Sequence, residues 1–175
     1  MPLRTVTARF TNSRDVLLAV QAALVNGLVD IFPDPAAIMI SDPENWDDGV
    51  PEPQISTAFL TVAPTDSDFP DDTQVGGGQF ACEELAGVAI TIFSDSRLDQ
   101  TGQMPAAVYD PNEGLFELKR RVLRVMVGAD PVGDNALPLL SQLVPIRRGT
   151  KPRKNPQGIH FITLEFGTSY FWDLS

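Results

Sequence analysis

The sequence has one cysteine, Cys82, and one histidine, His160. With one cysteine, an intrachain disulfide cannot form and a zinc site built from several cysteines cannot be assembled. A serine or cysteine nucleophile needs a histidine within hydrogen-bond reach, and no local pattern places Cys82 or a serine beside His160. The sequence therefore predicts no catalytic triad. We expect Cys82 and His160, which lies in an alternating strand pattern, to be structural.

Long apolar runs are absent too. No window reaches the ~18 consecutive apolar residues of a membrane-spanning helix, and the start of the chain lacks the apolar core of a secretory signal. We therefore expect a soluble protein that is made in the cytoplasm and has no membrane partner. The length of 175 residues and the apolar content of 43% fit one globular domain over residues 1–175.

Lysine and arginine are missing from a long part of the chain. Between Arg14 and Arg97 there is neither, while the same stretch contains fifteen Asp and Glu residues. Between Asp134 and Glu165 the bias reverses, with five bases and no acid. The net charge of −10 disfavours nonspecific binding to DNA and to anionic membranes. Because segregated charge can set register and orientation between neighbouring subunits, the pattern favours an assembly subunit over a monomeric enzyme.

Two helices are predicted from apolar residues at helical spacing. The first covers 13–31 and should end before the prolines that follow it, because proline removes a backbone donor. The second covers 111–127, with Asp110 as its cap and with Glu117 placed to pair with Arg121. Its remaining surface carries four bases, which we interpret as a solvated helix face: Lys119, Arg120, Arg121 and Arg124.

Strand signals lie between and after these helices. The strand predicted at 84–94 is apolar on both of its faces, which is typical of a central strand covered on two sides. Other strands are predicted at 36–40 and 54–63, and a hairpin runs out through 142–148 and back through 159–166. The sequence therefore predicts an α+β domain, with a mixed or antiparallel sheet flanked by two helices, long loops and a projecting C-terminal hairpin.

Loops of opposite charge separate these elements. Acidic loops are predicted at about 41–53 and 64–78, and the bases concentrate in a hairpin arm at about 142–166. Pro152 and Pro156 stiffen the tip of this arm and should block strand pairing there. We expect subunit or ring contacts from Arg147, Arg148, Lys151, Arg153, Lys154, Asp42, Glu44, Trp46, Asp47 and Asp48. The alternatives are that the charged loops are simply solvated and that the Trp46 side chain folds back on its own domain.

Metal and phosphate sites have weak support in the sequence. The carboxylates of Asp66, Asp68, Asp71 and Asp72 are close in sequence, but they lack the ordered ligands and glycine of a calcium loop. The glycine run at 76–78 has no lysine and helix after it, so flexibility explains it better than phosphate binding. We therefore expect no metal and no cofactor.

The order and lengths of these elements resemble the tail terminator (tail-completion, head-tail joining) proteins of long-tailed bacteriophages. The resemblance is carried by the helix at 13–31, the strand at 87–94, the helix at 111–127 and the last strand at 158–166. It covers most of the chain and does not depend on an invariant motif.

This resemblance implies a virion subunit without catalytic residues. Such proteins form a hexameric ring that stops polymerisation of the tail tube and joins it to the head connector or stopper protein, near DNA in the channel. It also implies assembly in the host cytoplasm, with the basic arm and the acidic loops lining the channel or contacting an adjacent ring. Because these acidic loops are longer than expected, another neck component (a head-completion or minor tail protein) remains an alternative. A soluble enzyme that binds metal through carboxylates is a further alternative.

Overall fold

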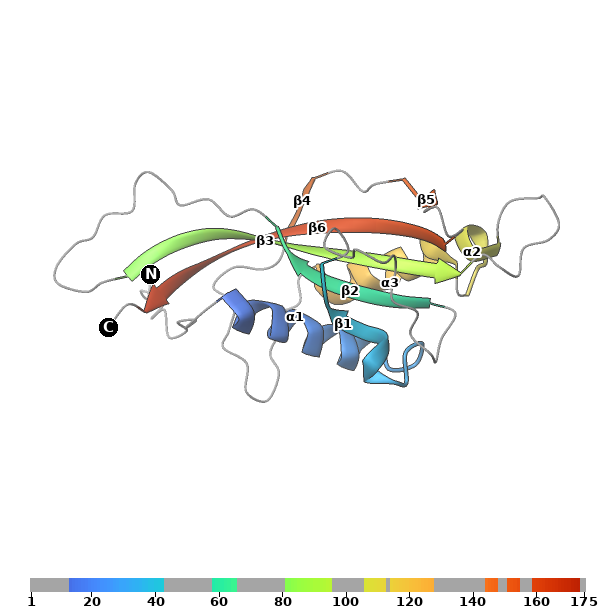
Figure 1. Cartoon of the computed structure of the whole chain (residues 1–175), viewed down its shortest axis with the longest axis horizontal. Coiled ribbons are helices and arrows are strands. Elements are labelled where there is room, and N and C mark those ends of the chain that lie inside the picture. The colour runs from blue at the N-terminus through green and yellow to red at the C-terminus, as the bar shows by residue number, and fades with distance from the viewer. Residues whose placement is uncertain are drawn as a thin grey trace, which may run out of the picture.

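A mixed sheet of six strands organises the described part of the chain (Figure 1). The structure is a computed structural model. It describes residues 13–42, 58–65, 81–95, 106–112, 114–127, 144–147, 151–154 and 159–173. The strands are β1 (Ile38–Ile40), β2 (Ala58–Pro64), β3 (Ala81–Asp95), β4 (Val144–Arg147), β5 (Arg153–Lys154) and β6 (Ile159–Asp173). The order across the sheet is β1, β2, β3, β6, β4, and β5 also pairs with β6. The β1 and β2 strands are parallel and the other pairs antiparallel, so the predicted α+β domain with a mixed sheet is confirmed.

Two helices, α1 (Ser13–Gly27) and α3 (Leu115–Met126), pack on one face of this sheet. Their buried residues recur at helical spacing and meet alternate residues of β2, β3 and β6. The central members of this core are Val20, Leu24, Leu118, Val122, Leu60, Ile90, Ile92 and Leu164. Each such buried side chain contributes about 1.5–3 kcal/mol, so apolar packing holds the two helices on the sheet.

The opposite face of the sheet carries a row of aromatic rings. The Phe59 and Phe93 rings are stacked with centroids 4.6 Å apart, and the Phe161 ring lies 5.8 Å from that of Phe93. Next to this row, the hydroxyls of Thr91 and Thr163 are hydrogen-bonded at 3.0 Å. Because Thr91 and Phe93 are buried here while Ile90 and Ile92 are buried against the helices, the prediction of a doubly covered central strand is confirmed.

The second helix begins later than predicted. The Asp110 carboxylate does cap a turn, because its Oδ1 accepts a hydrogen bond of 2.8 Å from the Asn112 amide. The chain then turns, and α3 starts at Leu115 rather than at residue 111. At Gly114 a Cβ would lie within 2.5–2.8 Å of backbone atoms of Asp110 and Val108, and this close approach separates the turn from the helix. A short helix, α2 (Ala106–Tyr109), precedes the turn.

The first helix and its neighbours follow the predictions more closely. The α1 helix ends at Gly27, and hydrogen-bonded turns continue the chain to Phe32, whose amide bonds to the Leu28 carbonyl at 2.8 Å. A single turn of 3-10 helix, η1 (Pro35–Ala37), follows, and the Asp34 carboxylate accepts from the Ala36 amide at its start. The predicted strand at 36–40 is therefore shortened to β1.

The β3 and β6 strands continue well beyond the other strands. The β2 strand pairs with residues 88–94 of β3, and β4 pairs with β6 at residues 165–167. The β3–β6 pairing nevertheless continues to Ala81 opposite Asp173, so residues 81–87 and 167–173 form a two-stranded ribbon. Figure 1 shows this ribbon extending past the N-terminal end of α1.

Part of the predicted arm tip lies on the sheet. The β5 strand falls within the tip, and its residues Arg153 and Lys154 pair with Phe161 and His160 of β6. The expectation that proline would block pairing here is wrong, because Pro152 lies outside the paired residues of a short edge strand. Pro156 lies outside the described residues.

Two opposed glycines, Gly87 and Gly167, mark the base of the ribbon. A Cβ at Gly87 would overlap the Thr65 hydroxyl and lie 3.0 Å from the Thr65 Cβ, while the Thr65 amide bonds to the Gly87 carbonyl at 2.9 Å. The absence of a side chain at Gly87 therefore lets the end of β2 close over β3 where the ribbon begins.

We predict that Gly87→Ala lowers the free energy of unfolding by about 1–3 kcal/mol, because the new methyl group must displace Thr65. Chemical denaturation of the purified chain measures this loss. In a Thr65→Ala background the same substitution should cost less, because the overlapping hydroxyl is gone. An unchanged stability of Gly87→Ala would show that Thr65 does not close over this position.

Candidate functional site

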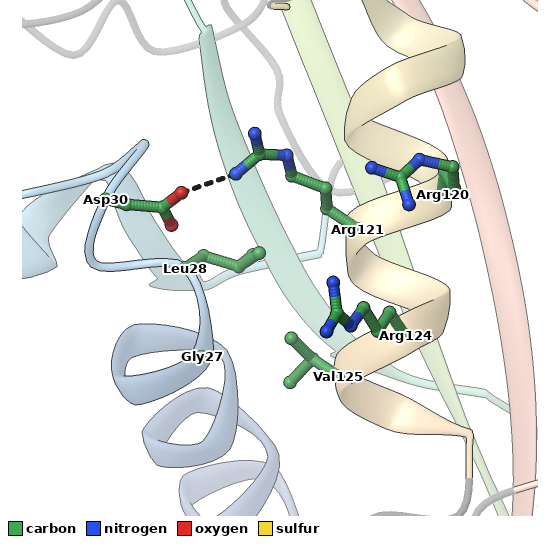
Figure 2. A pocket seen from close by; sticks show the side chains of 7 residues that line it. All are labelled: Gly27, Leu28, Asp30, Arg120, Arg121, Arg124 and Val125. Atoms are coloured by element: carbon green, nitrogen blue, oxygen red, sulfur yellow. Dashed lines mark hydrogen bonds and ion pairs between the residues drawn. The ribbon is translucent and has the colours of Figure 1, made fainter.

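A hollow of about 430 Å³ lies between the end of α1 and the outer side of α3 (Figure 2). It is lined by Gly27, Leu28, Asp30, Arg120, Arg121, Arg124 and Val125. Three of these seven residues are arginines from α3, whereas Asp30 follows α1 in the chain. The hollow therefore combines a basic wall with the C-terminal end of a helix.

A close helix contact forms the floor of this hollow. A Cβ at Gly27 would lie 2.6 Å and 2.8 Å from the two Cγ atoms of Val125, so the absence of a side chain lets α1 approach α3 here. The adjacent Leu28 is buried in the core beneath both helices. Apolar packing thus fixes where the arginines stand relative to α1.

The Glu117 carboxylate organises two of the arginines. It accepts hydrogen bonds from Arg120 at 2.7 Å and 2.6 Å and from Arg121 at 3.0 Å. The Glu117 side chain is only 16% exposed. These hydrogen bonds, first from Arg120 and then from Arg121, lower the pKa of the Glu117 carboxyl from 4.5 to about 2. The predicted pairing of Glu117 with Arg121 is confirmed, and Arg120 joins it.

The Arg121 guanidinium also reaches across the hollow. Its Nη1 donates to the Asp30 carboxylate, the contact drawn in Figure 2. Because the Asp30 side chain is 63% exposed and that of Arg121 is 33% exposed, solvent screens this ion pair. It fixes the direction of the Arg121 side chain more than it stabilises the fold.

The Arg124 side chain differs from its two neighbours. It is exposed, and within the described residues it makes no hydrogen bond or ion pair. Figure 2 shows its guanidinium on the side of α3 that faces α1. Three guanidinium groups against the two carboxylates of Glu117 and Asp30 leave one positive charge in excess around the hollow.

Two electrostatic effects compete in this hollow. The C-terminal end of α1 disfavours a nearby anion by about 0.3–1 kcal/mol. A hydrogen bond to a charged group contributes roughly 1.5–3 kcal/mol, which is the larger effect. The hollow is therefore suited to an acidic group, either a carboxylate or a phosphate, placed against the Arg124 guanidinium.

Exposed aromatic side chains are close in sequence to the arginines of the hollow. Phe116 precedes Arg120 and Arg124 by four and eight residues on α3, so the three side chains share one side of the helix. The Phe116 ring is 43% exposed and lies 5.4 Å from the Tyr109 ring. Aromatic residues and arginine are the residue types enriched at protein interfaces.

The sequence prediction missed this hollow because it interpreted the bases of α3 as a solvated face. The spacing of Arg120, Arg121 and Arg124 places them on neighbouring parts of one helix, which could have suggested a cluster. The close contact with Gly27 could not be anticipated, because it depends on how two helices about ninety residues apart in the chain pack together.

The predicted contact residues of the basic arm lie partly along β6. Arg147 is in β4 opposite Glu165, while Lys151, Arg153 and Lys154 are exposed in and before β5. Arg148 lies outside the described residues. Of the acidic group, Asp42 follows β1, whereas Glu44, Trp46, Asp47 and Asp48 also lie outside them. The contact role of these ten residues stays a prediction.

The residues considered for catalysis and metal binding are separate from the hollow. His160 is 9% exposed and pairs with Ser94 at the end of the core, and Cys82 pairs with Trp172 in the ribbon. No group of three or more His, Cys, Asp or Glu residues in the described ranges is arranged to hold a metal ion. The four aspartates at 66–72 lie outside these ranges. None of the helices that the structure describes is long and apolar enough to cross a membrane.

Comparison with known proteins gives a distant structural likeness. No protein-family model and no curated protein matches the sequence. The structure is similar to a chain from the virion of a native gene transfer agent (GTA) particle, with 20% sequence identity and a TM-score of 0.46. The likeness covers 85% of this chain and 92% of that chain. It is too distant to assign a family or a function.

The lowered pKa of Glu117 predicts a pH-dependent contribution to stability. Because the folded-state pKa of about 2 lies below the ordinary 4.5, the contribution is present above pH 4.5 and is lost as the pH falls towards 2. We expect wild type to melt at a higher temperature than Glu117→Gln near neutral pH, with a difference that shrinks over this acidic range. Thermal melts of both proteins across the range measure it.

A second variant tests the cause of this pKa shift. Arg120→Gln removes the donor with the largest effect on Glu117, so the pKa of Glu117 should be lowered less. The loss of stability should still begin near pH 4.5, but it should be smaller than in wild type and end at a higher pH. A difference between wild type and Glu117→Gln that persists unchanged down to pH 2 would contradict the assignment.

Proposed function

We propose that this chain is a noncatalytic structural subunit of a phage-like virion. In this proposal it forms a ring in the neck or tail that caps the tail tube and joins it to the head connector. The observation that carries the proposal is the ribbon formed by residues 81–87 and 167–173, which extends beyond the part of the sheet that the other described strands reach. The order of helices and strands that resembles tail terminator proteins gives further support.

The ribbon supports an assembly role because of its backbone. Beyond the glycine pair, each of its strands has one partner among the described residues, so each has a second edge of backbone amide and carbonyl groups. A two-stranded ribbon alone is marginally stable in water. Packing or strand pairing with a neighbouring subunit would supply the missing contacts.

The distribution of charge supports contacts between unlike surfaces. The basic residues Lys151, Arg153 and Lys154 lie exposed at the edge of the sheet, whereas residues 15–96 carry fifteen acids and no base. A contact between two different surfaces of one subunit type repeats from copy to copy and closes into a ring when the rotation allows. Six copies is the number that the resemblance to tail terminators implies.

The main alternative within this class is another neck component, such as a head-completion or minor tail protein. It would keep the same kinds of contact but would not control the length of the tail tube. No contact or distance in the described residues favours an enzyme over these structural roles.

We predict that reversing the charge of the basic arm abolishes joining of the tail to the head. The variant carries Glu at positions 147, 148, 151, 153 and 154. Its monomer should melt close to wild type, because exposed ion pairs contribute only ~0.2–1 kcal/mol each. Electron microscopy of particles assembled with this variant should show unjoined heads and tails.

The control for this experiment is Arg14→Glu combined with Lys119→Glu, which reverses two charges on helices α1 and α3 outside the arm. These particles should join normally. Normal joining by the arm variant itself would refute a contact role for the arm. Tail tubes of uncontrolled length in the absence of the protein would support a terminator, whereas tubes of normal length would support another neck component.

A further inference from the structure

The hollow between α1 and α3 could bind a negatively charged group, because its arginines are only partly paired with carboxylates. The Arg124 guanidinium faces it without an ion pair in the described residues, and the Arg120 side chain is 62% exposed although it is bound to Glu117. The hollow has room for several atoms of a partner, at about 430 Å³. An occupant must therefore bring acidic groups.

Apolar side chains close to the hollow in the chain add a second requirement. Val29, between two residues that line the hollow, is 60% exposed, and Val127 at the end of α3 is 50% exposed. The exposed Phe116 ring is on the same helix as the arginines, so apolar side chains are exposed on the segments that form the hollow. A protein segment that combines acids with a large apolar side chain is complementary to such a surface.

We propose that this hollow docks the acidic segment at residues 42–52 of a second copy of this chain. The segment carries Asp42, Glu44, Asp47, Asp48 and Glu52, contains no base, and places Trp46 among them. Its carboxylates would pair with Arg124 and Arg120, and the Trp46 ring would cover the adjacent apolar side chains. The contact is independent of the basic arm and does not require that the assembly be a viral ring.

A second copy is the occupant that the charges favour. The same chain carries both the basic hollow and the acidic segment, so two copies provide both halves of the contact. The halves are different surfaces, which makes the contact head-to-tail and allows it to repeat. A nucleic-acid phosphate could also pair with the arginines, but the net charge of −10 repels a polyanion from the molecule as a whole.

The test uses a fluorescein-labelled peptide with the sequence of residues 41–53, titrated with the full chain and followed by fluorescence anisotropy. We expect saturable binding to wild type, weakened about tenfold or more by Arg124→Glu. The matched control is Lys119→Glu, which makes the same charge change on the same helix outside the hollow. This control should bind within about threefold of wild type, because a distant exposed charge acts only through screened attraction.

A compensating pair tests whether the contact is direct. A peptide with Lys at positions 47 and 48 should bind Arg124→Glu more tightly than it binds wild type, reversing the order seen with the natural peptide. Thermal melts check that the variants fold, and Arg124→Gln replaces Arg124→Glu if the latter does not.

Three results would overturn the proposal. The first is equal binding of the natural peptide to wild type and to the Arg124 variant. The second is that the peptide does not bind wild type. This result also covers the case in which the acidic segment of the same copy already occupies the hollow. The third is that a double-stranded oligonucleotide binds more tightly than the peptide and that the Arg124 variant loses this binding. The hollow would then be a binding site for nucleic-acid phosphate. Virion imaging tests the proposed ring separately, because this peptide contact can hold or fail without it.

Discussion

The antiparallel pairing of β3 with β6 is the constraint on which the rest of the structure depends. Both strands are fifteen residues long and pair along their whole length. One half of the pairing places Ile90 beside Leu164 under the helices and Phe93 beside Phe161 on the opposite face. A shift of one residue would exchange these faces, so burial on both sides fixes the register. The other half has no helix layer within the described residues and forms the ribbon.

The helix layer shows how the core creates a surface feature. The α1 and α3 helices bury their apolar residues against the same face of the sheet, and this places the end of one beside the outer side of the other. Gly27 permits the close contact with Val125, and the arginines of α3 are then held around a hollow. Glu117 neutralises part of their charge, while Arg124 has no ion pair among the residues that the structure describes. The interaction surface therefore follows from apolar packing, and the polar contacts orient side chains within it.

The sequence predicted what depends on local pattern and missed what depends on packing. The α+β class, the doubly covered strand around Ile90 and the Glu117 to Arg121 pair follow from residue spacing and are confirmed. The start of α3 was wrong, because Gly114 allows a turn that the capping pattern does not reveal. The ribbon and β5 were missed because strand length and edge pairing depend on partners distant in sequence. The hollow was missed for the same reason.

The most direct test of the account is to image the assembled particle and count the copies of this chain. Electron microscopy at a resolution that separates subunits should show six copies in a closed ring where the tail meets the head. The β3–β6 ribbon of each copy should lie against a neighbouring subunit. A single copy, a dimer, or absence of the chain from the particle would contradict the account.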